Sequence, residues 1–143
     1  MKIHTTDNDD GMRRTIKALD EYPQGLIFTN LVEFDMLWGH RNDPPGFARA
    51  LERFDLQLGP LMELLTPADA LFISADHGCD PTTPSTDHSR ETVPILAFGQ
   101  SFNRGVNLGT RDSFTDLAAT VGEIFGVQGI EHGRSFLSDI LPS

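Results

Sequence analysis

Three continuous apolar runs constrain the fold of this chain more than any other feature of its sequence. The longest, GLIFTNLVEF at residues 25–34, is rich in branched and aromatic side chains. Such a run is typical of a strand buried on both faces, as strands of parallel sheets are. Two further runs, ALFISA at residues 70–75 and VPILAFG at residues 93–99, predict strands of the same kind.

Helical patterns alternate with these runs along the chain. Apolar residues recur at helical spacing in residues 9–22, 43–65 and 113–126, and residues 133–141 predict a short terminal helix. Strands that alternate with helices predict an α/β fold, with a mostly parallel sheet flanked by helices. The length of 143 residues suits one domain, residues 1–143.

Short polar side chains mark the expected starts of three helices. Asp9 or Asp10 is placed to cap the first helix. Asp43 precedes two prolines at the start of the second helix, which is a common start signal. Ser113 and Asp116 match a capping box at the start of the third helix.

Charge and composition limit the partners of the chain. Its net charge of -10 disfavours nucleic acid, because binding phosphates requires a cationic surface. No apolar run approaches the ~20 residues of a membrane span, and the polar first residues contain no signal peptide. The single cysteine, Cys79, excludes an internal disulfide. We therefore expect a cytoplasmic protein that binds neither nucleic acid nor membrane.

Carboxylate and imidazole side chains follow the first two expected strands. Asp35 ends the first, and His40 lies five residues later; Asp76 and His77 end the second, and His88 closes the loop beyond it. Because ligands collect at the carboxyl ends of parallel strands, these side chains are candidates for one site. Carboxylate and imidazole together suit manganese, zinc or iron better than calcium or magnesium.

Each polar group also has an ordinary structural role. The spacing alone therefore does not decide between a metal site and a set of separate structural contacts. An Asp after a strand often caps a helix or a turn, and Asp87 is expected to be a turn residue or to contact a ligand. His4 and His132 lie outside the cluster and are expected at the surface. The loop hydroxyls are expected to make turn hydrogen bonds: Thr82, Thr83, Ser85, Thr86 and Ser89.

Two long segments carry a resemblance to a known family. Residues 25–55 and 74–99, with the pattern ADHGCDPT…TDHSRE…VP in the second, resemble the carboxyl-terminal part of the phosphopentomutase family, within the alkaline phosphatase superfamily. The resemblance extends from Lys2 to Leu141. It implies an alkaline-phosphatase-like core and an isomerase that interconverts ribose 1-phosphate and ribose 5-phosphate, and their deoxy forms, with two manganese ions.

The resemblance also implies roles for the five candidate ligands. Asp35, His40 and His88 match the protein ligands of one metal, and Asp76 and His77 match two ligands of a second, incomplete site. Manganese is the implied metal, and zinc is a possible one.

Three residues depart from the family pattern around the first site. Glu33 and Trp38 stand where the pattern VDFDxxYGHRR has Asp and Tyr, and Asn42 replaces an Arg. None of the three is an expected ligand. The departures therefore concern the fine tuning of the site and leave its expected metal ligands unchanged.

The family proteins are longer, and the resemblance implies that this chain is the carboxyl-terminal portion of an incomplete core. Their amino-terminal segment supplies a further aspartate ligand and the threonine that carries phosphate, and a separate cap domain contacts the sugar phosphate. We therefore expect no catalytic nucleophile here, a pentose phosphate substrate, a need for the missing segment in cis or in trans, and an exposed sheet edge that favours homo-oligomers. A non-catalytic metal-binding fragment and a metal-dependent phosphatase or phosphodiesterase that uses water remain alternatives.

Overall fold

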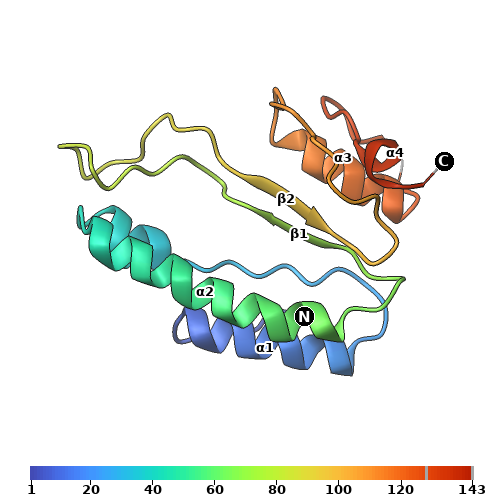
Figure 1. The fold of residues 1–143 in the computed structure, drawn as a ribbon, viewed down its shortest axis with the longest axis horizontal. Helices are drawn as coiled ribbons and strands as arrows, with labels where there is room; N and C mark the ends of the chain where they lie inside the picture. Colours follow the sequence, from blue (N-terminus) through green and yellow to red (C-terminus); the bar gives the residue numbers. More distant parts are fainter. Residues whose placement is uncertain (128, 143) are drawn as a thin grey trace. The chain divides into compact units, whose positions relative to one another are not determined.

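A computed structural model describes residues 1–127 and 129–142 of the chain. The chain forms two compact units: the first comprises Met1–Leu65 and His77–Ile95, and the second comprises Thr66–Asp76 and Leu96–Ser143. The elements follow in the order α1 (Asn8–Glu21), the π-helix η1 (Phe34–Gly39), α2 (Pro44–Leu64), β1 (Leu71–Ser74), β2 (Ile95–Phe98), α3 (Thr115–Ile124) and α4 (Leu137–Ile140) (Figure 1). None of the helices in the described residues is long and apolar enough to span a membrane.

Helix α1 confirms the first expected helix but corrects its cap. The capping side chain is Asp7, whose Oδ1 accepts from the backbone N–H of Asp10 at 2.7 Å. Asp10 lies one turn further on, where it is 3% exposed and forms ion pairs with Arg13 and Arg14. Asp9 instead pairs with an arginine of α2. The prediction that Asp9 or Asp10 caps this helix was therefore wrong, because the helix begins at Asn8 and its cap is the residue before it.

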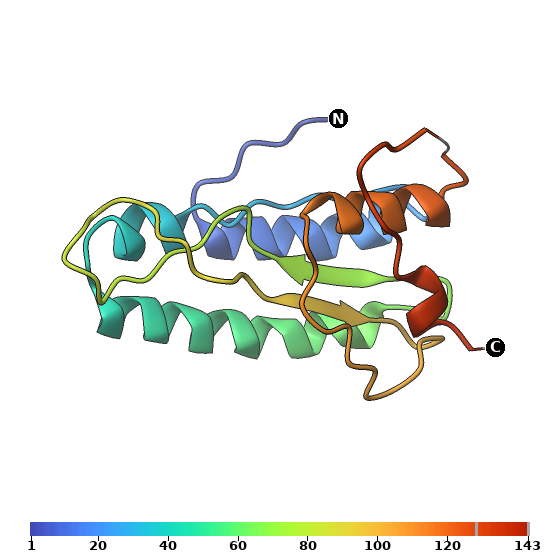
Figure 2. The ribbon, with the colours of Figure 1, turned by 90° about the horizontal axis from the view of Figure 1, so that it is seen from above.

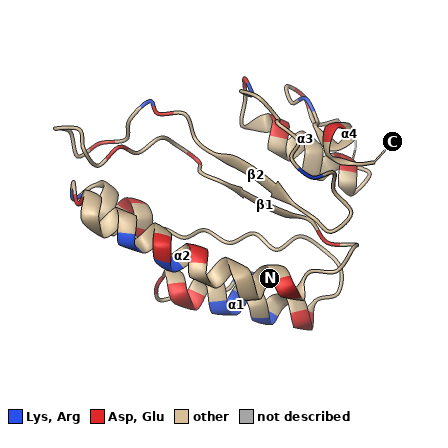
Figure 3. Cartoon of the chain, in the orientation of Figure 1, with Lys and Arg blue, Asp and Glu red and all other residues tan. Residues whose placement is uncertain are grey.

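Helix α2 begins as its sequence predicts and lies alongside α1 within the first unit (Figure 2). Asp43 caps it by accepting from the backbone N–H of Gly46 at 2.9 Å. Its buried Ala50 and Leu61, with Leu65 just beyond its end, contribute to the core of this unit. Acidic and basic positions are interleaved along α1 and α2 (Figure 3), as expected for helix faces that contact water.

The expected strand at residues 25–34 is not formed, and this prediction was wrong for the described chain. Residues 26–31 form no regular element and pair with no strand, and the run ends in the turn and helix that begin at Val32 and Glu33. One face packs towards α1, where the hydroxyls of Thr29 and Thr15 lie 2.6 Å apart. On the opposite face Leu26 is 65% exposed and Phe28 is 85% exposed. A strand exists only through hydrogen bonds to a neighbour, which an apolar pattern cannot supply by itself.

The other two expected strands are confirmed as β1 and β2. In the described residues they form a two-stranded sheet, and their arrows run in opposite directions in Figure 1. The described chain therefore combines helices with a small antiparallel sheet. The expected mostly parallel sheet is not formed within these residues, because the two strands that pair are antiparallel and the third expected strand is unpaired.

The second unit contains Phe136, the completely buried residue that directly precedes α4, with its ring centroid 6.0 Å from that of Phe72 in β1. Thr120 is also completely buried; its hydroxyl accepts from the backbone N–H of Phe136 at 3.0 Å and donates to the carbonyl of Asp116 at 2.8 Å. The guanidinium of Arg111 lies 5.2 Å from the centroid of the Phe136 ring. Every polar group named here has a partner, as burial requires.

Asp116 has a different role from the expected capping box. Its carboxylate accepts from the backbone N–H of Arg134 at 2.9 Å and from the side chain of Arg111 at 2.8 Å. These two contacts, in that order of importance, hold the pKa of Asp116 below its ordinary value. The residue before α3 is Phe114, which makes no side-chain cap, and the Ser113 hydroxyl instead accepts from the backbone N–H of Thr115 at 3.2 Å.

Candidate metal centre

The π-helix η1 brings Asp35 and His40 together. Its wide turn is closed by a hydrogen bond from the backbone N–H of His40 to the carbonyl of Asp35, at 2.9 Å. A turn with i→i+5 hydrogen bonds stacks residues that are five apart, whereas an α-helix would place them on different faces. The Nε2 of His40 consequently lies 3.2 Å from the Oδ2 of Asp35. Such turns occur frequently at functional sites.

Phe34 anchors this turn to the first unit. Its ring centroid lies 6.0 Å from that of Trp38, 5.7 Å from that of Phe47 and 6.1 Å from that of Phe54. The tilted and edge-on geometries of these rings are those that aromatic pairs prefer. Because Asp35 directly follows Phe34, this aromatic cluster fixes the position from which the carboxylate emerges.

Gly39 is required by the close approach of Cys79. A Cβ at position 39 would lie 2.6 Å from the Sγ of Cys79 and 3.2 Å from the carbonyl oxygen of Phe34. The thiol is partly desolvated and lies near the carboxylates of Asp35 and Asp80. Burial first, and then these two charges, raise the pKa of Cys79, so the thiol stays protonated at neutral pH.

A short bridge closes the loop that carries the other two histidines. Gly78 and Ser89 form an isolated antiparallel bridge, in which the backbone N–H of Ser89 donates to the carbonyl of Gly78 at 3.1 Å. A Cβ on Gly78 would lie 2.5 Å from the carbonyl oxygen of Ser89, so only glycine fits there. The residues that flank the bridge, His77 and His88, stack with ring centroids 3.6 Å apart.

Asp35, His40 and His88 form a cluster whose potential ligand atoms all lie within 4.8 Å of one another. The Nε2 of His88 lies 3.5 Å from the Oδ1 of Asp35, and the Nε2 of His77 lies 3.9 Å from the same oxygen. This oxygen is buried and has no hydrogen-bond partner among the described residues. A buried carboxylate oxygen that faces imidazole nitrogens fits a cation, which would satisfy it.

Backbone carbonyls contact the Nδ1 atoms of two histidines and so orient their rings for metal binding. The Nδ1 of His40 faces the carbonyl of Thr86 in a very short contact, and the Nδ1 of His77 lies 3.0 Å from the carbonyl of Gly78. A carbonyl can only accept, so each Nδ1 is the hydrogen-bond donor, and Nε2 is the nitrogen that a neutral ring has left for a metal. Holding the outer nitrogen in this way is how metal-binding histidines are usually oriented.

Asp76 is placed differently from the other four predicted ligands. It ends the first segment of the second unit and is exposed, whereas the other four belong to the first unit. The three-residue cluster does not include it. The structure thus brings together Asp35, His40 and His88, adds His77 at their edge, and assigns Asp76 to the other unit.

Three of the five loop hydroxyls make turn contacts, as expected, whereas the prediction was wrong for Ser89, whose Oγ is buried without a hydrogen-bond partner among the described residues. The hydroxyl of Thr82 donates to the Oδ1 of Asp80 at 2.6 Å, and that of Thr83 donates to the carbonyl of Asp80 at 3.0 Å. The hydroxyl of Ser85 accepts from the backbone N–H of Asp87 at 3.0 Å. Asp87 is therefore a turn residue, one of the two roles expected for it.

Sequence reasoning missed three contributors to this centre. The carbonyl of Thr86 orients His40, the thiol of Cys79 lies against Gly39, and the amide of Asn42 reaches the loop at Thr83, where its Nδ2 lies 2.7 Å from the carbonyl. Backbone carbonyls leave no mark in a sequence. The departure from the family pattern at Asn42 was the one available signal.

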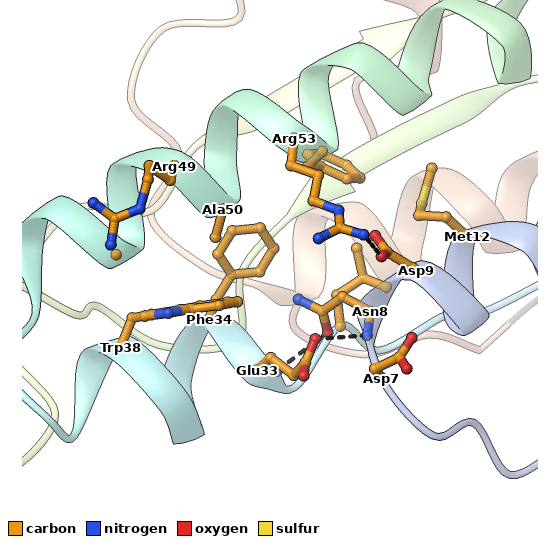
Figure 4. Close-up of a pocket in the computed structure, with 13 residues that line it drawn as sticks. Asp7, Asn8, Asp9, Met12, Glu33, Phe34, Trp38, Arg49, Ala50 and Arg53 are labelled. Carbon is orange, nitrogen blue, oxygen red and sulfur yellow. Dashed lines mark hydrogen bonds and ion pairs between the residues drawn. The ribbon is translucent and has the colours of Figure 1, made fainter.

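A pocket of about 480 Å³ lies among α1, η1 and α2 within the first unit (Figure 4). None of the five predicted ligands lines it. Its polar groups pair across the helices: Arg53 contacts Asp9, and Asn8 and Glu33 exchange two hydrogen bonds at 2.8 and 3.2 Å. These pairs indicate that the pocket wall serves helix packing.

Comparison with known proteins agrees with the chemistry of this cluster. The model of the family described as the metalloenzyme superfamily matches residues 2–129. The chain is 54% identical over 139 residues to the phosphopentomutase of Clostridium novyi (strain NT), covering 97% of this chain and 36% of that protein. It is 52% identical to the phosphopentomutase of Kosmotoga olearia, covering 97% of this chain and 36% of that protein. It is 55% identical to the phosphopentomutase of Anaeromyxobacter sp. (strain K), covering 97% of this chain and 35% of that protein.

The resemblance seen in the sequence motifs is therefore confirmed, although the chain spans only about a third of the length of the curated relatives it matches, 36% for the Clostridium novyi protein. The match to the superfamily covers most of the chain, and the cluster of Asp35, His40 and His88 supports a metal cofactor. The chain belongs to the metalloenzyme superfamily.

Proposed function

We propose that this chain is the metal-binding, carboxyl-terminal portion of a phosphopentomutase, which interconverts ribose 1-phosphate and ribose 5-phosphate and their deoxy forms. The observation that carries the proposal is the buried Oδ1 of Asp35, which lacks a hydrogen-bond partner and faces the Nε2 of His88 at 3.5 Å. Relatives at 52% to 55% identity that are named phosphopentomutase support the reaction class.

Asp35, His40 and His88 would hold one metal ion, and Asp76 and His77 would contribute to a second, completed by a ligand from the remainder of the protein. Manganese is the proposed ion, and zinc suits the same carboxylate and imidazole donors. When bound, such ions hold phosphoryl oxygens and offset the negative charge that develops in phosphoryl transfer. The two oxygens of Asp35 face different histidines, so this one carboxylate organises the cluster.

The proposed phosphate-carrying threonine lies outside this chain. The hydroxyls of Thr82, Thr83 and Ser85 are already engaged in turn hydrogen bonds, which argues against their use as nucleophiles. We therefore assign no catalytic nucleophile to these residues. The chain would act with the segment that completes its longer relatives, in cis or in trans, on a pentose phosphate.

The proposal extends to the fold and the cellular setting. Residues 1–143 would form the carboxyl-terminal portion of an alkaline-phosphatase-like core domain, in which the extended segment 25–34 joins a mostly parallel sheet. The exposed side chains of Leu26 and Phe28 support this, because they suit a sheet face that is covered. When no further segment covers it, the edge that segment 25–34 exposes would favour homo-oligomers. A cytoplasmic location fits a chain with one free thiol, Cys79.

A calorimetric titration of the full chain with manganese tests the metal site. We expect one site per chain, which is lost in His88→Ala because that substitution removes one of the three clustered ligands. His4→Ala, which removes an exposed histidine of the same unit, is the matched control and should bind as the wild type does. Equal affinity in the wild type and in His88→Ala would exclude the proposed site.

A chimera tests the reaction. The matched 139-residue region of the Clostridium novyi phosphopentomutase is replaced by this chain, and conversion of ribose 1-phosphate to ribose 5-phosphate is measured. We expect the chimera to be active and its His88→Ala form to be inactive. A chimera that folds and binds manganese without converting the sugar phosphate would contradict the assigned reaction.

A further inference from the structure

The turn that follows η1 has a specific backbone conformation at Asn42. The backbone N–H of Asp43 donates to the carbonyl of Trp38 at 3.0 Å, and that of Asn42 donates to the carbonyl of Gly39 at 3.1 Å. Together these bonds form the closure known as a Schellman motif. Asn42 occupies its left-handed position, with φ of 49°. Glycine is the usual residue there, and asparagine is the most common alternative.

The side chain of Asn42 makes a contact that glycine could not make. Its Nδ2 donates to the carbonyl of Thr83 at 2.7 Å, across 41 positions of sequence. Its Oδ1 is buried and has no hydrogen-bond partner among the described residues. Burying an unpaired acceptor is unfavourable, so the amide is retained at some cost to stability. This cost suggests that the contact with Thr83 serves a purpose other than folding.

That contact holds the loop on which the metal site depends. The loop between Gly78 and Ser89 is closed at its base by the bridge between these two residues. Thr83 lies near its far end, and the loop then returns through Thr86, whose carbonyl orients His40, to His88. The turn containing His40 and Asn42 thus contacts the loop at two points, and both points lie in the first unit.

We propose that Asn42 is a positioning residue of the metal centre. Its amide fixes the loop of residues 78–89, so that the carbonyl of Thr86 holds the tautomer of His40 and the ring of His88 lies beside Asp35. The inference rests on the proposed function, because it concerns the same metal site.

Two substitutions separate this role from the backbone role of the residue. Asn42→Gly keeps the left-handed conformation and removes the amide, and Asn42→Asp keeps both the conformation and the size but removes the donor. Asn103→Gly is the matched control, because the Nδ2 of Asn103 also donates to a backbone carbonyl, that of Leu141 at 2.9 Å, in the second unit.

Manganese affinity and the unfolding midpoint are measured for the full chain and these three variants. We expect both Asn42 variants to bind manganese about tenfold more weakly, as is typical when a partner of a metal-binding histidine is lost. The midpoint of Asn42→Gly should match that of the wild type, and Asn103→Gly should bind manganese with unchanged affinity. Wild-type affinity in both Asn42 variants overturns the inference.

Hydrogen exchange of the metal-free chain gives a second readout that does not depend on the proposed function. The backbone N–H groups of Thr83 and Ser89 are hydrogen-bonded within the loop. We expect both to exchange faster in Asn42→Gly, while those of α2 are unchanged. If the wild type binds no manganese, the proposed function fails, and unchanged exchange at these two amides would overturn the positioning role as well.

Discussion

The two units of this chain differ in how completely they satisfy their buried polar groups. In the second unit, the buried Thr120 and Asp116 have all the partners described above, and Phe136 packs over them. Among the described residues, three buried side-chain atoms lack a partner, and all belong to the first unit: the Oδ1 of Asp35, the Oδ1 of Asn42 and the Oγ of Ser89. Asp35 is a member of the candidate metal cluster, and Asn42 contacts the loop that carries His88. The buried polar groups named in the second unit are thus satisfied within the fold, whereas the first unit retains buried polar atoms without a partner.

Phe136→Ala gives the largest expected loss of stability and tests the independence of the two units. Removing a completely buried aromatic side chain should lower the free energy of unfolding by about 3–5 kcal/mol. Urea unfolding followed by circular dichroism measures this loss. Manganese affinity of the folded protein should be unchanged. A parallel loss of affinity would show that the two units are coupled, and the comparison would fail.

Asp35→Asn should weaken manganese binding without lowering stability, which is the opposite of the result expected for Phe136→Ala. Loss of the carboxylate should weaken manganese binding about 100-fold, which corresponds to about 2.7 kcal/mol. Stability of the metal-free protein should stay the same or rise, because the substitution removes the charge of a carboxylate whose Oδ1 is buried without a hydrogen-bond partner. Calorimetry measures the first effect and urea unfolding without metal the second. A large loss of metal-free stability would mean that Asp35 serves folding rather than binding.

Thr120→Val tests whether the satisfied network of the second unit contributes to stability. The substitution is nearly isosteric, but it leaves the buried backbone N–H of Phe136 without its acceptor. The expected loss is about 1–3 kcal/mol of unfolding free energy, measured by urea unfolding. Ser85→Val is the control, because it removes a hydroxyl whose contact is exposed. Equal effects of the two substitutions would argue that burial of the Thr120 hydrogen bonds has no special role.

The sequence predicted the helices and the short strands well, because their signals are local. Periodic apolar residues and the cap at Asp43 were sufficient for α2, and the short apolar runs were sufficient for β1 and β2. The expected strand at residues 25–34 failed because a strand needs a partner, which no local pattern specifies. The expected capping box failed because the carboxylate of Asp116 accepts instead from the backbone N–H of Arg134, 18 positions away, and from the side chain of Arg111, just before the pattern.

The candidate site was read from the sequence in part. Residue types and the resemblance were sufficient to select Asp35, His40 and His88, which the structure brings together. The π-helical turn that aligns Asp35 with His40 was not foreseen, because no residue pattern distinguishes it from an ordinary turn. The positioning contact of Asn42 was also missed, since its acceptor is a backbone carbonyl 41 positions away.

The smallest expected effect is a difference between Asp116→Asn and the wild type in how stability falls on acidification. The backbone N–H of Arg134 and the side chain of Arg111 lower the pKa of Asp116 from its ordinary value of 3.8. A lowered pKa in the folded state means that the stabilisation is fully present above the ordinary pKa and disappears as pH falls through the folded-state pKa. Asp116→Asn should therefore be less stable than the wild type at pH 7 but lose less stability on acidification below about pH 4. Urea midpoints measured from pH 7 to pH 2 check this, and identical slopes for the two proteins would show that Asp116 does not contribute to the acid sensitivity of the second unit.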